Sequence, residues 1–336
     1  MALPAAIAIL VLLLIGPLLS HWVEKNLEVY CFFLGASAIG FAGQVSWELA
    51  KKVLFDPIPI AMAVLIAGVL FKFGRKWFDR ALARMQRRFS RPVLAAIIVA
   101  TIALLSSLIT SIVAALMLVE ALRALRLPRD KLLRVTVTGC MAIGLGASLT
   151  PLGEPLSTIA VDLLNLEFFA LFGLLAPYVL PGIVVCAALV AFHARGAYIE
   201  EKHRATRSES LLVILRRGAE VFAFIAGLVL LGEAYAPLAR TYLSELSAPV
   251  LFWTNVAGAA LDNATVVAIE ISDMPLSLAR EVILSLLASG GMLIQGNIPN
   301  IIAANALNIS ALSWARVGVP IGLLFLIGYF LCLRLA

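Results

Sequence analysis

Long runs of apolar residues dominate the chain, and short polar or basic segments separate them. A helix that crosses a bilayer needs about 20 consecutive apolar residues, and eight of the runs approach or exceed that length. Two further apolar runs, at residues 92–122 and 249–271, carry polar residues near their middle and need a separate interpretation. The eight predicted spans are residues 3–19, 29–47, 58–73, 135–164, 168–192, 219–236, 280–309 and 317–333.

The composition agrees with a chain surrounded by lipid. Of the 336 residues, 62% are hydrophobic and 14% are charged, whereas a soluble domain is about 45–50% apolar and about 25% charged. The formal net charge of +6 would suggest nucleic acid as a partner of a soluble protein. Here the basic residues fall in blocks between apolar runs, so we expect the lipid bilayer and not nucleic acid as the partner.

Three basic blocks predict which loops face the cytoplasm. Residues 72–91 contain eight Lys and Arg residues, residues 123–134 contain five, and residues 193–217 contain six, which is 19 of the 26 in the chain. Cytoplasmic loops carry an excess of Lys and Arg, so we place all three blocks inside. The sequence therefore predicts an all-α polytopic membrane protein, multi-pass in the cell (inner) membrane.

The apolar run at residues 92–122 has a cytoplasmic block at each end. Its 31 residues are too few for two full spans at a rise of about 1.5 Å per residue. We therefore expect a re-entrant helical hairpin that enters the bilayer and returns. The alternative is one long tilted helix, which would place one basic block outside. The polar residues at the expected tip are Ser106, Ser107, Thr110 and Ser111.

The run at residues 249–271 predicts a second hairpin, which enters from the outer face and has LDNAT at 261–265 as its tip. Each half of the chain then contains a helix, a hairpin, a helix broken by Gly and Pro, and a further helix, in opposite orientations. Such inverted repeats are a common plan among secondary transporters. The predicted units are two N-terminal helices at 1–57, a first repeat at 58–192 with its broken helix at 135–164, a basic cytoplasmic linker at 193–217, and a second repeat at 218–336 with its broken helix at 280–309.

The two tips and the two broken helices are the expected ion-binding site. Backbone that leaves the helix at membrane depth is tolerated only where it is buried in protein or lines a wet cavity. Hard oxygen ligands suit sodium or similar cations. The candidate residues are Ser106, Thr110, Ser111, Thr150, Gly153 and Glu154 in the first half, and Asp262, Asn263, Thr265, Gly296, Asn297 and Asn300 in the second.

Two of these candidates are carboxylates, Asp262 at the second tip and Glu154 in the first broken helix. A carboxylate at membrane depth is costly unless it is neutralised or paired. Protonation neutralises it, so we interpret both residues as proton carriers. The alternative role for each is to cap the helix that follows it. We interpret Glu120 and Glu270, at the ends of the two hairpins, as interfacial.

The second tip and the second break resemble motifs of a known superfamily. LDNAT at 261–265 resembles the acidic hairpin motif of NhaD-type sodium/proton antiporters, and GGMLIQGNIPN at 290–300 resembles the broken-helix motif of the wider ion transporter superfamily. The chain is also similar to a group of predicted cation transporters. The resemblance spans residues 58–333 and implies two hairpins, two unwound helices, an elevator-like or rocking alternation and a homodimer. It also implies a cation site formed by Asp262, Asn263, Thr265 and Asn297.

These patterns favour a secondary active transporter, and within that class a cation (sodium)/proton antiporter with alternating access. The first tip lacks the Asn and Asp of the antiporter pattern, and neither tip carries the Ser-Asn-Thr motif of dicarboxylate carriers, which argues against a dicarboxylate substrate. The alternative is a sodium- or proton-coupled carrier of an organic or inorganic anion. We do not expect an enzyme, because the sequence offers no nucleophile–base pair or phosphate-binding loop. We expect no cofactor and no structural metal, only transported sodium and protons.

Overall fold

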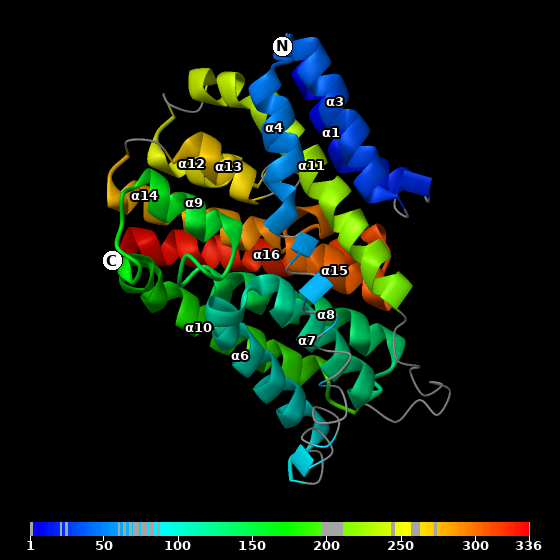
Figure 1. The fold of residues 1–336 in the computed structure, drawn as a ribbon. Coiled ribbons are helices and arrows are strands. Elements are labelled where there is room, and N and C mark those ends of the chain that lie inside the picture. Colours follow the sequence, from blue (N-terminus) through cyan, green and yellow to red (C-terminus); the bar gives the residue numbers. More distant parts are fainter. Residues whose placement is uncertain are drawn as a thin grey trace.

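The structure is a computed structural model of the chain. It describes residues 3–20, 22–23, 26–59, 88–196, 211–242, 246–256, 263–271 and 274–335, with residues 61–62, 65–66, 69, 74, 80 and 84–85 in addition. Every regular element in these ranges is a helix (Figure 1). The prediction of an all-α fold is therefore confirmed.

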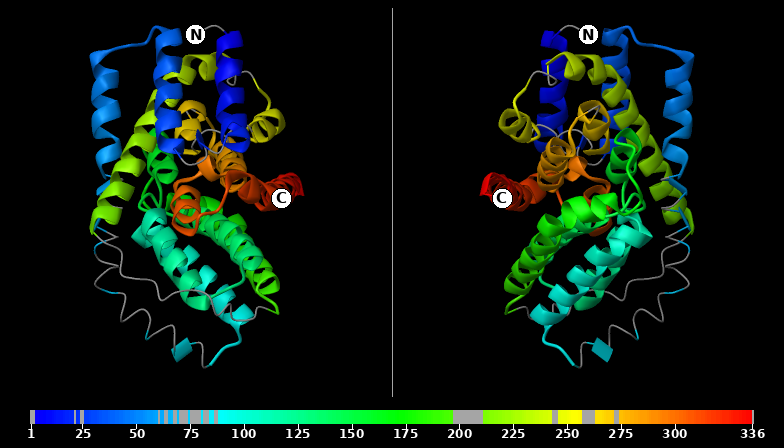
Figure 2. Two further views of the ribbon diagram at one scale, coloured as in Figure 1. Left: turned by 90° about the vertical axis from the view of Figure 1, so that its right-hand side faces the viewer. Right: turned by 90° about the vertical axis from the view of Figure 1, so that its left-hand side faces the viewer.

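The N-terminal helices and one later long helix lie together at the top of Figures 1 and 2. They are α1 (Leu3–Leu19), α3 (Leu27–Ala42), α4 (Trp47–Phe55) and α11 (Leu211–Tyr242). α11 packs against α3 and α4, and Lys52 Nζ on α4 lies 2.6 Å from Glu233 Oε1 on α11. We call these four helices the N-terminal unit.

The helix in the predicted span at residues 29–47 ends earlier than predicted, at Ala42, and a second helix, α4, begins at the last residue of the span, Trp47. Gly43 follows α3 with a φ of 65° and ends it in the left-handed conformation, which glycine adopts without strain. Ser46 then starts α4, because its side chain accepts a hydrogen bond from the Leu49 N–H at 3.0 Å. The predicted span at 58–73 falls largely outside the described residues.

Five helices follow the first basic block. They are α6 (Arg91–Ile109), α7 (Ser111–Leu125), α8 (Arg129–Ala147), α9 (Pro155–Leu163) and α10 (Ala170–His193). The run at 92–122 forms two helices that pack on each other, since Thr110 between them has a φ of 72°, which a right-handed helix cannot contain. The single long helix considered for this run is therefore wrong. α8 and α9 occupy the predicted broken helix at 135–164.

The C-terminal part of the chain also contains two short helices, a broken helix and a long helix. These elements are α12 (Ala248–Thr254), α13 (Asn263–Glu270), α14 (Leu276–Gly290), a 3-10 turn η2 (Ile294–Gly296), α15 (Ile298–Leu307) and α16 (Ala311–Leu335). The interruption predicted within residues 280–309 is present between α14 and α15. Residues 257–262, which include the predicted tip residue Asp262, lie outside the described part.

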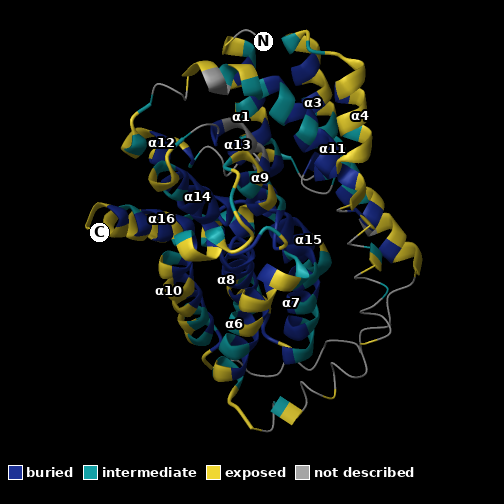
Figure 3. Cartoon of the chain, turned by 60° about the vertical axis from the view of Figure 1, so that its left-hand side comes forward, coloured by how far each residue is buried: buried dark blue, intermediate teal, exposed yellow. Residues whose placement is uncertain are grey.

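The two broken helices form the interior of the molecule. All residues from 135 to 150 and from 281 to 304 are buried, and Figure 3 shows α8 and α14 dark blue at the centre. A helix that is apolar all round belongs inside a protein or in lipid. α10 and α16 pack against α8 and α14 and show exposed side chains on their outer faces, as expected of helices that meet lipid.

Helices from the two halves of the chain contact one another. α7 packs against α15, and α9 packs against α13. Arg123 on α7 donates to the Ala306 carbonyl at 2.7 Å and pairs with Glu120 at 2.5 Å. Arg129 on α8 donates to the Asn308 carbonyl at 3.1 Å. Two guanidinium groups thus bind the C-terminal end of α15, where the helix dipole favours positive charge.

Within the part of the chain that the structure describes, four helices are long and apolar enough to cross a membrane. They are α6, α10 and α16 over their full lengths and α11 over Leu211–Leu238. α1, α3 and α15 are shorter apolar helices. These lengths and compositions support the prediction of a membrane protein with transmembrane helices.

Replacing Arg123 by Ala removes the guanidinium that joins α7 to the end of α15. Hydrogen bonds to charged groups contribute about 1.5–3 kcal/mol, so we expect a clear fall in the melting temperature of the protein in detergent. The control is Arg216→Ala, because Arg216 pairs with Glu220 on α11 with its side chain 81% exposed, and surface pairs contribute only about 0–1 kcal/mol. Equal melting temperatures for the two variants would contradict the role of Arg123.

Candidate functional site

The interrupted segments of the chain meet in the interior, and at each of them a helix begins. α7 begins at Ser111, α9 at Pro155, α13 at Asn263 and α15 at Ile298. Hydrogen bonds and close contacts link these four starting points in sequence, from the first tip to the first break, then to the second break, and then to the start of α13. We call this region the junction.

The first tip is bound to the first break. The Ser111 N–H donates to the Gly153 carbonyl at 2.7 Å, and the Thr150 hydroxyl donates to the Ser107 carbonyl. Thr110 accepts a hydrogen bond from the Val113 N–H at 3.5 Å and so caps α7. Thr110, Ser111, Thr150 and Gly153, which the sequence separates by about 40 positions, are therefore neighbours, as the sequence analysis expects.

Glu154 and Asn297 join the two breaks. Asn297 Nδ2 donates to Glu154 Oε2 at 3.4 Å, across 143 positions of sequence. Glu154 is 5% exposed. It occupies the capping position of α9, but its side chain makes no capping hydrogen bond to that helix, and Asn297 stands in the same relation to α15. Both side chains are therefore directed to the junction and not to their own helices.

Asn300 and Asn263 complete the junction on the side of α14. Asn300 Nδ2 donates to the carbonyls of Gly290 and Leu293, at 2.8 and 2.9 Å. The Asn263 side chain lies against Gly290, where a Cβ atom would stand 2.2 Å from Asn263 Nδ2. Neither the oxygen nor the nitrogen of the Asn263 amide has a hydrogen-bond partner in the described structure, and the same is true of Asn300 Oδ1.

Unpaired buried polar atoms are rare in folded proteins, and each one needs an explanation. The amide oxygens of Asn263 and Asn300 belong to buried side chains at the point where four helices begin. An oxygen in such a position is free to bind an ion. Together with the Glu154 carboxylate, these oxygens provide hard ligands for a cation.

The remaining candidates are placed differently. The Ser106 hydroxyl donates to the carbonyls of Ala103 and Ile143, at 2.6 and 3.1 Å, and so fixes α6 on α8. Gly296 is buried at the end of η2. Asp262 and the side chain of Thr265 fall outside the described residues. The structure thus brings together Thr110, Ser111, Thr150, Gly153, Glu154, Asn263, Asn297 and Asn300.

The junction contains both positive and negative partial charges from helix ends. Four helices begin at the junction, and a helix N-terminus favours negative charge. α6, α8 and α14 end there, and a helix C-terminus favours cations. Within the described residues, no three His, Cys, Asp or Glu side chains form a group that would hold a metal ion.

Sequence reasoning missed a second polar cluster. Glu270 at the end of α13, interpreted as interfacial from the sequence, is 9% exposed and is covered by protein. The Asn255 side chain hydrogen-bonds to Glu270, and Asn255 Nδ2 donates to the Ser285 hydroxyl at 2.9 Å. The sequence does contain a signal for this cluster, because the apolar run at residues 249–271 contains Asn255 and ends close to the acid Glu270.

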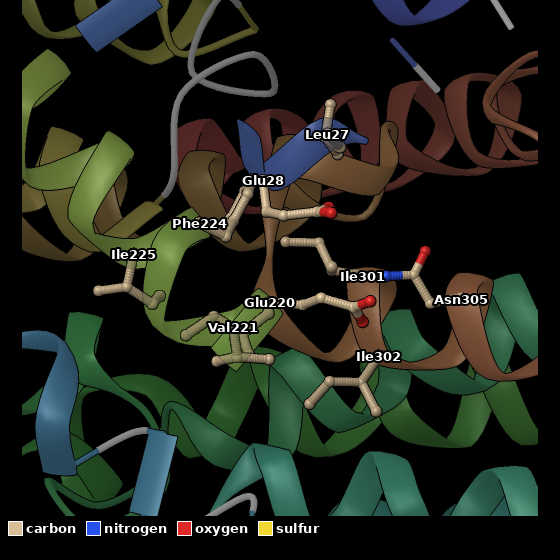
Figure 4. Close-up of a pocket in the computed structure, with 10 residues that line it drawn as sticks. Leu27, Glu28, Glu220, Val221, Phe224, Ile225, Ile301, Ile302 and Asn305 are labelled. Carbon is tan, nitrogen blue, oxygen red and sulfur yellow. The ribbon is translucent and has the colours of Figure 1, made fainter. Parts of the chain in front are cut away.

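A pocket lies between the N-terminal unit and α15 (Figure 4). Glu28 of α3 and Glu220 of α11 direct their carboxylates into it, and Asn305 of α15 faces them. The other lining residues are apolar: Leu27, Val221, Phe224, Ile225, Ile298, Ile301 and Ile302. The candidate residues predicted from the sequence do not line this pocket, but Ile298, with which α15 begins at the junction, does.

Gly290→Ala places a methyl group where Asn263 now lies. The Cβ contact of 2.2 Å forces Asn263 to move, and overpacking of this kind costs about 1–3 kcal/mol. We expect a lower melting temperature in detergent. The control is Gly328→Ala on α16, where a Cβ meets no atom within 4 Å and where Ala favours the helix by about 1 kcal/mol. An unchanged melting temperature for Gly290→Ala would refute the close contact.

Two comparisons with known proteins were informative about the whole chain. A family model described as "Protein of unknown function (DUF1646)" matches residues 3–335. The search of curated proteins finds no match. The match therefore covers all the helices described above, including the four that begin at the junction.

Proposed function

The chain belongs to the DUF1646 family of proteins of unknown function, and we propose that it is a secondary active transporter that exchanges a cation, in the first place sodium, for protons. The proposed location is the cell (inner) membrane, with the basic segment at 193–217 on the cytoplasmic side. The observation that carries the proposal is the buried Glu154 carboxylate, which meets Asn297 at a junction of four helix starts.

An inverted repeat is the arrangement we propose for the two halves. The order α6, α7, α8, α9, α10 parallels the order α12, α13, α14, α15, α16. Glu154 and Asn297 occupy matching positions, because each has an extended backbone and precedes a helix with a Pro in its first two positions. The contacts are reciprocal as well, since α7 packs on α15 of the other half and α13 packs on α9. In this proposal α6–α7 and α12–α13 are the two re-entrant hairpins.

Exchange follows from the cost of burying a negative charge. At membrane depth an ionised carboxylate is costly unless a positive charge or a proton neutralises it. Glu154 is therefore stable in two states, ionised with a bound cation or neutral with a bound proton. Because the empty ionised site is costly, the site changes its access only when it is loaded with one or the other. Asp262, which precedes Asn263 in the sequence, is proposed as a second group of this kind.

Sodium-dependent proton flux in proteoliposomes tests this function. We expect wild-type protein to acidify or alkalise the lumen when a sodium gradient is imposed. Glu154→Gln and Asp262→Asn each remove an exchangeable proton and should lower the flux by about tenfold or more, which corresponds to about 1.4 kcal/mol of barrier. Glu233→Gln is the control, because Glu233 pairs with Lys52 on the surface of the N-terminal unit. Full flux in both Glu154→Gln and Asp262→Asn would remove the basis of the proposal.

An anion carrier is the second candidate, and the four helix N-termini at the junction favour it. In this case the free N–H groups and the Asn side chains hold the anion, and a cation or proton at Glu154 balances its charge. Uptake of labelled carboxylates and oxyanions into the same proteoliposomes distinguishes the two. Uptake of an anion that persists in Asp262→Asn, without sodium-dependent proton flux in wild type, would favour the anion carrier.

A further inference from the structure

Glu270 is a buried acid that the proposed exchange at the junction does not use. It is the last residue of α13, whose first residue, Asn263, lies at the junction. Seven residues of helix separate the two, which is about 10 Å along the axis. Glu270 is therefore outside the junction but on the same rigid element as one of its ligands.

The surroundings of Glu270 favour its neutral form. The side chain is buried, and Oε2 has no hydrogen-bond partner in the described structure. It stands at the C-terminal end of α13, where the helix dipole is negative and opposes a carboxylate. Asn255 hydrogen-bonds to it and is in turn held by Ser285, whose hydroxyl donates to the Val282 carbonyl at 2.8 Å. The Asn255 hydrogen bond favours the ionised form and so opposes burial, but neither Asn255 nor Ser285 supplies a positive charge.

No described charged group neutralises Glu270. α9, α11 and α14 are the helices that pack against α13, and none of their charged residues forms an ion pair with it in the described chain. On α14, Arg280 lies over the Tyr178 ring at 5.4 Å and Glu281 pairs with Arg334 at 2.5 Å. The charged residues on the three helices are Asp162, Arg216, Arg217, Glu220, Glu233, Arg240, Arg280 and Glu281. Asp273, beyond the end of α13, lies outside the described residues.

We propose that Glu270, positioned by Asn255 and Ser285, is a second proton-binding site, separate from the junction. The ligand is one proton, which binds to Oε2 from water and returns to water. In the arrangement seen here the site holds its proton, because an uncharged carboxyl is the form that can be buried without a cation.

The site is coupled to the junction through α13, and this part of the inference rests on the proposed function. When the junction exchanges its ion, a shift of Asn263 moves the whole of α13 and changes how Glu270 packs against α14. A move that admits water lets Glu270 ionise, and a move that excludes water requires it to be protonated. Glu270 thus adds a proton-dependent step to the exchange without contacting the transported cation.

Infrared difference spectroscopy of the purified protein tests the proton site without any transport assay. We expect a carbonyl band of a protonated carboxyl at neutral pH, with an intensity of one group per chain lost in Glu270→Gln. Glu281→Gln is the matched control, since Glu281 has the same 9% exposure but pairs with Arg334, and it should keep the band. A band of unchanged intensity in Glu270→Gln would show that Glu270 is ionised and would overturn the inference.

A second variant keeps the test decisive if Glu270→Gln does not fold. Asn255→Ala retains the carboxyl but removes its hydrogen-bond partner, so the band should shift in frequency, and an unshifted band would contradict the site. Proteoliposomes then separate this inference from the proposed function. Wild-type protein without cation-dependent proton flux, but with the band assigned to Glu270, would refute antiport and leave the proton site intact. Normal cation-dependent proton flux without a band assigned to Glu270 would refute the proton site and leave antiport intact.

Discussion

A broken helix inside a membrane protein leaves backbone N–H and C=O groups that water cannot reach, and the rest of this structure depends on how they are paired. The first tip and the first break pair with each other, since the Ser111 N–H binds the Gly153 carbonyl and Thr150 binds the Ser107 carbonyl. Within the second break Asn300 binds the Gly290 and Leu293 carbonyls, and Asn297 joins the two breaks by its bond to Glu154. Because water does not reach these groups, each interruption depends on such partners. The interruptions therefore have to lie together, and the helices that carry them, α8 and α14, have to be the most deeply buried.

This pairing is incomplete, and the unpaired groups lie at the proposed ion-binding site. The Asn263 amide and the Asn300 oxygen are buried without partners among the described residues, beside the Glu154 carboxylate. Evolution tolerates such groups when a ligand pairs them for part of the time. A site whose polar groups are paired only when a ligand is bound favours the bound state. A site whose side chains are all paired with one another would bind nothing. The same argument applies to Glu270, for which the ligand is a proton and the partner a neutral amide.

Much of the fold is predictable from local patterns, and the site is predictable in outline. Apolar runs locate α1, α10 and α16, and Gly and Pro locate the breaks after α8 and α14, because these signals act within one turn of helix. The end of α3 and the start of α4 depend on the capping residues Gly43 and Ser46, which lie inside the span predicted at residues 29–47. The Glu154–Asn297 contact joins residues 143 positions apart. No local sequence signal predicts this contact. It can be expected only if the two halves of the chain are supposed to be repeats whose broken helices meet.

The burial of Glu270 shows why the rest escapes sequence reasoning. An acid at the end of an apolar run suggests a side chain that faces water, but Glu270 at the end of α13 is covered by protein. The pocket beside α15 is a second feature that the sequence does not predict. α15 turns Asn297 and Asn300 to the junction and Ile301 and Asn305 to the pocket lined by α3 and α11. The boundary between α15 and the N-terminal unit is thus less closely packed than the core around α8. Relative motion costs least where the fewest contacts are broken, so this boundary is where the proposed alternation of access meets the least resistance.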